Sequence, residues 1–221
     1  MQTVTEQIVQ EALRRDPQRK RPWVMLVDGH KDQLRVIHRV FKWHAVDAPL
    51  ILDFIHVLEY LWRAAWCFFD SDDKGQSRQA EKWVLAKAQA LLDGRSGNVA
   101  AGIRIKASRV GLSAKQLKTI DDVARYLTNH TAMLRYDEFL SKGYPIATGV
   151  IEGACRHLIG DRFEITGARW SLKTAEGILR LRAIRSSGDW VAYQTFHKKK
   201  EWERHHFQRF SEEERSAMAW K

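Results

Sequence analysis

The chain has 221 residues, with 37 Lys and Arg against 27 Asp and Glu, which leaves a formal net charge of +10 at pH 7. This length suits one core domain with an insertion, and the positive charge favours a partner that carries phosphates. The sequence shows neither an apolar stretch of about 18 residues nor a signal segment, so we expect no membrane association. Two cysteines, Cys67 and Cys155, make neither a disulfide framework nor a zinc site, and we expect reduced core thiols in a cytoplasmic protein.

The first 69 residues predict part of an α/β core. After an amphipathic N-terminal helix, hydrophobic spacing predicts a strand near 22–27, a helix over 33–43, a strand near 49–52 and a long apolar helix over 54–69. This order implies a parallel strand pair with a right-handed crossover. Asp28 and Asp53 directly follow the two strands, at the carboxyl ends where open parallel sheets bind ligands.

The rest of the chain is predicted to be mostly helical. A polar loop over 70–79 precedes helical patterns, and Ser113 is expected to cap the last of them. These patterns cover 80–93, 96–111 and 113–130. A later helix is expected over 172–186, ending at a Ser-Gly pair. The predicted divisions are a partial core (1–69), a helical insertion (70–140), the remainder of the core (141–188) and a basic tail (189–221).

Glu152 lies in an unusually polar, glycine-containing segment, PIATGVIEGACRHLIGDRFEITGARW at 145–170. If a helix begins near Gly149, Glu152 and Arg156 are one turn apart on one face. The residues then expected to face the core are Ile151, Ala154, Cys155 and Leu158. A carboxylate displayed in this way suits metal or phosphate chemistry, although an ordinary exposed ion pair with Arg156 explains the pattern too.

The aspartates at the strand ends also allow two interpretations. Asp28 precedes a glycine, so it fits a tight turn or a helix cap as well as a site, and Asp53 can cap the helix that follows it. Asp53, His56, Glu59 and Arg63 recur at helical spacing along an apolar helix. A buried polar stripe of this kind indicates either a site or a satisfied hydrogen-bond network in the core.

Acidic residues at two strand ends and on one helix, in a basic chain, together suggest a carboxylate cluster that holds Mg²⁺. Magnesium prefers oxygen ligands and keeps several waters, which leaves room for phosphate oxygens. Two such ions about 3.5–4 Å apart activate an attacking hydroxyl and stabilise the departing oxygen in phosphoryl transfer.

Four stretches of sequence resemble the insertion-sequence transposases of the Kra type, which have a ribonuclease-H-like DDE domain and are distantly related to the Mutator group. The stretches are WVMLVDG at 23–29, LDFIHVLEYLWRAAWCFF at 52–69, GYPIATGVIEGACRHLIGDRFEITGARW at 143–170 and LRLRAIRSSGDW at 179–190. The resemblance covers nearly the whole chain from about residue 16. It implies a mostly helical α/β chain with a partial ribonuclease-H-like fold, in which an all-helical insertion interrupts two parallel strands and their flanking helices.

The resemblance also implies residue roles and partners. Asp28 matches the second catalytic aspartate and Glu152 the catalytic glutamate, which in the complete family site hold two Mg²⁺ or Mn²⁺ ions. Asp53 and His56 match the family's C/D-x-x-H signature beside the site, with a supporting role. The expected activity is DNA cleavage and strand transfer of an insertion sequence, on transposon ends and target DNA, in the cytoplasm at the nucleoid. DNA-facing candidates are Arg156, His157, Arg169 and Trp170 beside the site, with Lys198, Lys199 and Lys200 in the tail.

One departure from the family pattern changes the expected activity. The family's first catalytic aspartate lies on an earlier strand, and the 27 residues before Asp28 are too few for three strands and a helix. We therefore expect the C-terminal part of a transposase, inactive alone and with an open sheet edge beside the first strand. Two alternatives remain: a non-catalytic DNA-binding or transposase-inhibiting module that associates with itself or with full-length transposase, and a Mg²⁺-dependent nuclease that uses Asp28, Asp53 and Glu152.

Overall fold

The computed structural model describes residues 2–165 and 167–207, without the side chains of residues 2, 150, 152, 206 and 207. The described chain is mostly helical and contains a parallel pair of short strands. It divides into two compact units, residues 1–150 and 151–221, and each is described by itself. None of the described helices combines the length and the apolar composition needed to cross a bilayer.

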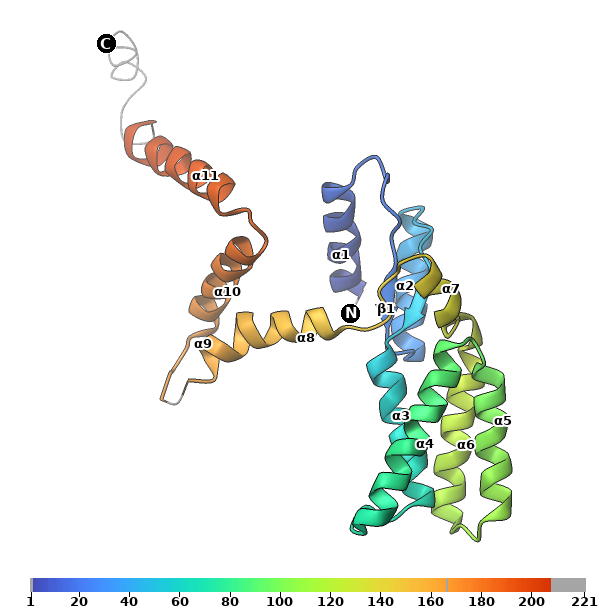
Figure 1. Ribbon diagram of the computed structural model, residues 1–221. Helices are drawn as coiled ribbons and strands as arrows, with labels where there is room; N and C mark the ends of the chain where they lie inside the picture. Colours follow the sequence, from blue (N-terminus) through green and yellow to red (C-terminus); the bar gives the residue numbers. More distant parts are fainter. Residues whose placement is uncertain (1, 166, 208–221) are drawn as a thin grey trace. The chain divides into compact units, whose positions relative to one another are not determined.

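The first unit contains the strand pair and most of the helices (Figure 1). Its elements are α1 (Gln2–Arg15), β1 (Met25–Val27), α2 (Lys31–Trp43), β2 (Leu50–Leu52), α3 (Phe54–Phe68), α4 (Lys74–Leu92), α5 (Ser96–Arg109), α6 (Ala114–Asn129), the 3₁₀ turn η1 (Thr131–Met133) and α7 (Tyr136–Ser141). The helix α8 (Gly149–Cys155) begins at the end of this unit.

The predicted parallel strand pair is confirmed, with shorter strands than expected. Strand β1 pairs with β2 in the register Met25 with Leu50 and Val27 with Leu52. The ladder begins where the Met25 N–H donates to the carbonyl of Pro49, at 3.0 Å. Proline lacks an N–H and cannot donate to a ladder, so Pro22 and Pro49 lie outside the paired residues.

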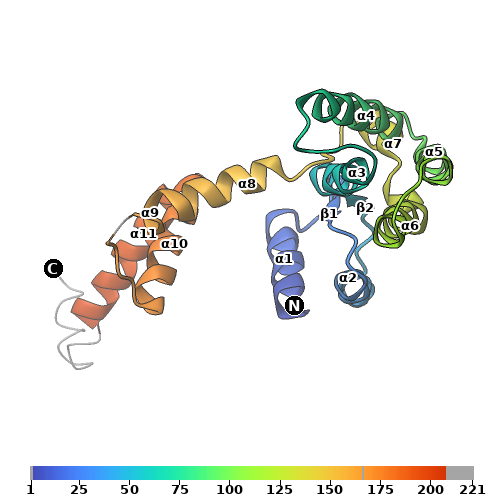
Figure 2. The ribbon, with the colours of Figure 1, turned by 90° about the horizontal axis from the view of Figure 1, so that it is seen from below.

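The core of the first unit lies between helices, chiefly under α3. Val57, Leu61 and Ala64 of α3 are fully buried at the i, i+4, i+7 spacing that places them on one face of the helix. Helix α3 packs against α4 and α6, and α5 packs against α4 and α6. Figures 1 and 2 show these four helices side by side. The predicted all-helical composition of this region is confirmed.

Helix ends in this region follow their caps. The predicted cap Ser113 is confirmed, because its hydroxyl accepts the backbone N–H of Gln116 and the Gln116 side chain returns to the Ser113 backbone. The loop predicted over 70–79 is wrong in its second half, because α4 begins at Lys74. The Asp73 carboxylate accepts the backbone N–H groups of Gly75 and Gln76, and this cap starts the helix about six residues early.

The described part of the second unit consists of helices joined by turns and loops at 164–171, apart from residue 166, and at 187–189. After α8 come the π-helical turn η2 (Arg156–Gly160), α9 (Asp161–Phe163), α10 (Leu172–Ser186), α11 (Trp190–Trp202) and the π-helical turn η3 (Glu203–Phe207). Helix α10 has the bounds predicted for it and is capped by Ser171, whose hydroxyl accepts the N–H of Thr174. The region predicted as a tail contains α11, and its residues 208–221 lie outside the described residues.

The core-facing stripe predicted around Glu152 is wrong. Ile151 is 57% exposed, Ala154 and Cys155 are exposed, and only Leu158 is partly buried. The helix changes to π-helical hydrogen bonding at Arg156, so Leu158 does not continue the α-helical spacing of the earlier apolar positions. Cys155 is therefore not the core thiol that was expected, whereas Cys67 is buried as predicted.

Candidate functional site

The two strand-end aspartates follow neighbouring strands of the sheet. Val27 and Leu52 are partners in the register, and Asp28 and Asp53 are the next residue of each strand. The Asp53 N–H donates to the Val27 carbonyl at 2.8 Å, so the parallel ladder continues up to this point. The predicted meeting of Asp28 and Asp53 at the carboxyl edge of the sheet is confirmed.

Asp28 begins a tight turn and keeps an exposed carboxylate. Its Oδ1 accepts the backbone N–H of His30 at 2.8 Å, which is the turn interpretation of this residue. Its second oxygen accepts no hydrogen bond from a described residue, so it retains lone pairs for a ligand. The turn and the site interpretations of Asp28 are thus compatible.

Gly29 allows the turn to pack closely against its surroundings. Its φ is +85°, a conformation that side chains with a Cβ rarely adopt. A Cβ at this position would lie 2.9 Å from Leu52 Cδ2 and 3.2 Å from Tyr126 Cε2. Both the backbone conformation and the available space therefore require glycine beside Asp28.

Helix α6 also supports this turn. The Tyr126 hydroxyl donates to the backbone carbonyl of Asp28 at 2.9 Å. Burial raises the pKa of the Tyr126 hydroxyl, and Tyr60 and Asp28 raise it further, so the hydroxyl stays protonated as a donor at neutral pH. One turn later, His130 Nδ1 lies 2.8 Å from the Tyr126 carbonyl, an acceptor, which makes Nδ1 the protonated nitrogen.

A polar cavity of about 770 Å³ opens between the Asp28 turn, α2, α3 and α6. Part of its wall is an aromatic stack, in which the rings of Tyr60 and Tyr126 are nearly parallel with centroids 3.9 Å apart. The guanidinium of Arg63 lies over the Tyr60 ring at 4.9 Å. Cationic and carboxylate side chains line the remainder of the cavity, together with His30, His56 and His130.

Asp53 acts as a helix cap and as a link between segments. Its Oδ1 accepts the N–H groups of Ile55 and Thr148, each at 3.2 Å, and its Oδ2 accepts the Thr148 hydroxyl. A third connection in the same place joins the Phe54 N–H to the Ile146 carbonyl at 2.8 Å. The cap predicted for Asp53 is confirmed, and the carboxylate also fixes the chain just before Gly149, where α8 begins.

His56 lies on the cavity wall, in a polar stripe that is less buried than predicted. Its Nδ1 is 3.1 Å from Glu59 Oε2, and the side chains of His56 and Glu59 are 34% and 64% exposed. Arg63, one turn further along, is exposed. The stripe is therefore not a hydrogen-bond network inside the core, because Glu59 and Arg63 are exposed, and His56 and Arg63 line the open cavity.

Glu152, the other predicted catalytic acid, belongs to α8, and its side chain lies outside the described residues. Nearby, Arg156 and His157 are exposed, and His157 Nδ1 lies 3.1 Å from Asp161 Oδ2. The Arg182 side chain donates to the carbonyls of His157 and Leu158, which ties α10 to the π-helical turn.

The two other residues predicted to face DNA beside Glu152 differ in exposure. Arg169 is exposed, whereas Trp170 is partly buried, with Arg162 over its ring at 5.0 Å and Phe163 at 5.2 Å. Trp170 packs within the second unit, which leaves less of its indole ring for stacking on a base.

The basic residues of the predicted tail lie on a regular helix. Lys198, Lys199 and Lys200 are exposed on α11, and Lys200 Nζ forms an ion pair with Glu203 Oε2 at 2.8 Å. Three consecutive residues of a helix point in directions about 100° apart, so these lysines do not form one row along one face. They present positive charge around the helix rather than a single phosphate-binding groove.

Few side chains of the described residues at the strand ends have an oxygen available to bind a metal ion. No group of three His, Cys, Asp or Glu side chains in the described part of the chain could hold a metal ion. Asp28 offers one open carboxylate oxygen, whereas both oxygens of Asp53 accept hydrogen bonds. Mg²⁺ is commonly bound by one or two carboxylates together with phosphate oxygens and water. Asp28 therefore fits a metal ion shared with a phosphate rather than a closed protein site.

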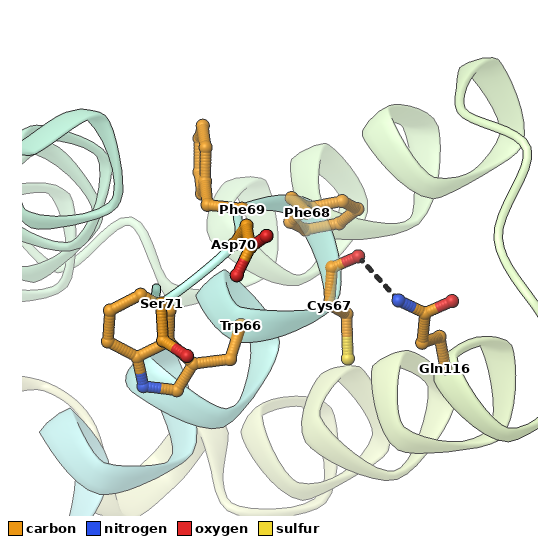
Figure 3. Close-up of a pocket in the computed structure, with 7 residues that line it drawn as sticks. All are labelled: Trp66, Cys67, Phe68, Phe69, Asp70, Ser71 and Gln116. Atoms are coloured by element: carbon orange, nitrogen blue, oxygen red, sulfur yellow. Dashed lines mark hydrogen bonds between the residues drawn. The ribbon is translucent and has the colours of Figure 1, made fainter. Parts of the chain in front are cut away.

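A second pocket, of about 390 Å³, lies at the C-terminal end of α3, far along that helix from Asp53 (Figure 3). Trp66, Phe69, Asp70 and Gln116 are among its lining residues, and the Gln116 side chain donates to the Cys67 carbonyl at 3.2 Å. This pocket contains none of the predicted site residues.

Reasoning from the sequence missed the residues that come from distant segments. Tyr60 and Tyr126 form the cavity wall, and Thr148 holds Asp53. The signals in the sequence were weak: a tyrosine and a histidine one turn apart near the end of α6, and a Thr-Gly pair before α8. No protein-family model, curated protein or solved structure matches the chain.

Proposed function

We propose that the chain is part of the ribonuclease-H-like catalytic domain of a DDE transposase, with Asp28 and Glu152 as metal-binding acids that act on transposon-end and target DNA. One observation carries the proposal. The Asp53 carboxylate at the sheet edge holds Thr148, so the chain returns from the helical insertion to the strand ends four residues before Glu152. This contact fixes the segment that leads into the glutamate helix at the strand ends, and it is the observation that supports the proposal.

The residues of the proposed site have separate tasks. The open oxygen of Asp28 and the carboxylate of Glu152 would hold Mg²⁺ or Mn²⁺, which when bound activates an attacking hydroxyl and stabilises the departing oxygen. Tyr126 and Gly29 keep the Asp28 turn in one conformation, and Asp53 anchors the segment before Glu152. His56 would face a bound strand from the cavity wall.

Binding of Mn²⁺ to the ¹⁵N-labelled protein tests whether Asp28 and Glu152 share an ion. Paramagnetic broadening should affect the amide signals of Gly29 and Gly153 together. Glu152→Gln should reduce the broadening at Gly29, and Asp28→Asn should reduce it at Gly153. Asp70→Asn, at the other end of α3, serves as the control. Broadening of only one segment, or broadening that these variants leave unchanged, would exclude the shared site.

The self-contained nuclease receives less support, because Asp53 already accepts three hydrogen bonds. Asp16 does not replace the family's first acid either, since its carboxylate accepts the N–H groups of Lys20, Arg21 and the Trp23 indole. We therefore expect no Mg²⁺- or Mn²⁺-dependent nicking of supercoiled plasmid by the chain alone. Nicking that Asp53→Asn and Glu152→Gln abolish would favour the nuclease instead.

A further inference from the structure

Two cations that line the cavity beside Asp28 form no ion pair with a carboxylate of the described residues. Lys31, at the start of α2, and Arg63, on α3, both line it. Neither forms a salt bridge with a residue in the described part of the chain, whereas Arg35 pairs with Asp32 at 2.9 Å and Arg125 lies 3.6 Å from Asp122. Lys31 and Arg63 are thus available to an anion that enters the cavity.

Arg63 is also held in a defined orientation. Its guanidinium lies over the Tyr60 ring, and Tyr60 stacks on Tyr126, which is fixed to the Asp28 turn. A guanidinium that lies over an aromatic face keeps N–H groups at its edge that can donate to an anion. Lys31, at the start of α2, adds a flexible point charge to the lining of the cavity.

The charge balance of the cavity limits the kind of anion. Four cations and three carboxylates line it, which leaves a net charge of +1 with histidine neutral; these are Lys31, Arg35, Arg63 and Arg125 against Asp28, Asp32 and Asp122. A phosphodiester carries one negative charge and matches this balance. A phosphate monoester carries about −1.5 to −2 and would be left in excess beside Asp28.

We infer that the cavity binds one phosphodiester group of a nucleic-acid strand, between Lys31 and Arg63. The inference rests on the proposed function in that it takes the strand to be DNA. It adds to the proposed site a contact with the DNA backbone, made by Lys31 at the start of α2 and by Arg63 on α3. A strand held in this way lies in the cavity that Asp28 also lines.

Anisotropy of a fluorescent single-stranded DNA 20-mer tests the inference, in EDTA so that metal-dependent cleavage plays no part. Lys31→Gln and Arg63→Gln should each reduce the magnitude of the slope of log K against log salt by about 0.7. If variant and wild type bind equally at 1 M salt, this makes the variant bind about eightfold more weakly than the wild type at 50 mM salt. Arg63→Lys should recover part of the loss because it restores the charge without the planar stack. Thermal unfolding of each variant confirms that it folds.

Two control variants each remove one positive charge from a helix position away from the cavity lining. Lys115→Gln lies on α6 eleven residues before Tyr126, about 16 Å along the helix, and Arg78→Gln lies on α4. Cavity variants that bind no more weakly than these controls would overturn the inference while leaving the proposed function intact. Absence of DNA binding by the wild type would overturn both. The competitors are inorganic phosphate, a mononucleotide and chloride at equal ionic strength. If phosphate or the mononucleotide displaces the DNA more strongly than chloride does, the cavity is a site for phosphate monoesters, and the inference of a diester site is overturned.

Discussion

The hydroxyl of Tyr126 donates a hydrogen bond to the backbone carbonyl of Asp28, across 98 residues of sequence. This bond joins the helical insertion to the end of β1. It means that the conformation of the proposed metal-binding aspartate depends on α6 as well as on its own strand. Helix α6 therefore has a structural task here, because it supports the turn that displays the carboxylate.

Tyr126→Phe removes this hydrogen bond and keeps the stacked ring. We expect the free energy of unfolding in urea to fall by about 1 kcal/mol, since the Asp28 carbonyl loses a partly buried partner. Amide exchange at Gly29 and His30 should accelerate as the turn loosens. Tyr60→Phe is the control, because the Tyr60 hydroxyl makes no hydrogen bond with a described residue. Equal effects of the two variants would show that the Tyr126 hydroxyl contributes nothing specific.

Gly29→Ala is expected to destabilise the protein by about 2–4 kcal/mol. The positive φ alone costs about 1–2 kcal/mol for a residue with a Cβ, and the contacts with Leu52 and Tyr126 add an overpacking cost of similar size. Gly143→Ala separates the two effects, because Gly143 has a φ of +70° and open space around a Cβ. Chemical denaturation should show a clearly larger loss for Gly29→Ala, and similar losses would refute the steric part.

Asp53 and Thr148 should be energetically coupled. We expect Asp53→Asn and Thr148→Val each to cost about 1–2 kcal/mol, because each removes hydrogen bonds to an ionised carboxylate at a partly exposed position. The double variant should cost about 1 kcal/mol less than the two separate losses together, as the second change finds the bond already broken. Strict additivity in a urea-unfolding cycle would mean that the link does not hold the segment before α8.

The hydrogen bonds of the Asp73 carboxylate lead us to expect that the stability of the protein depends on pH. Hydrogen bonds from Gln76 and then Gly75 lower the pKa of the Asp73 carboxyl in the folded protein. A lowered folded pKa stabilises the protein above the ordinary aspartate pKa, near 3.9, and this contribution is lost as the pH falls through the folded pKa. Asp73→Asn should therefore lower the melting temperature most above about pH 5 and progressively less below about pH 4.

Asp72→Asn is the control for this titration. The Asp72 carboxylate accepts no hydrogen bond from a described residue, so Asp72→Asn removes a neighbouring carboxylate without removing a cap. Equal changes of the pH dependence in the two variants would show that the cap is not its cause. If Asp73→Asn lowers the melting temperature by the same amount at every pH, the stabilisation by the cap does not depend on the charge of the Asp73 carboxylate.

Local signals predicted most of the elements. The parallel strand pair, the helices after it, the Ser113 cap and the bounds of α10 all follow from hydrophobic spacing and capping residues that lie within a few positions of one another. The start of α4 was predicted wrongly although its signal is local too. Asp73 is itself a local capping signal, but the polar composition of 70–79 outweighed it in the prediction.

The sequence by itself determined which residues stand at the strand ends, because a short apolar run that stops at an aspartate is a local pattern. It also indicated the helical insertion and the cap at Asp53. Only the tertiary structure decided how these residues are used: Tyr126 reaches Asp28, Thr148 reaches Asp53, and Lys31 and Arg63 share one cavity. These contacts join segments up to 98 residues apart, and their partners are chosen by the packing of α3 against α6, which no local spacing encodes.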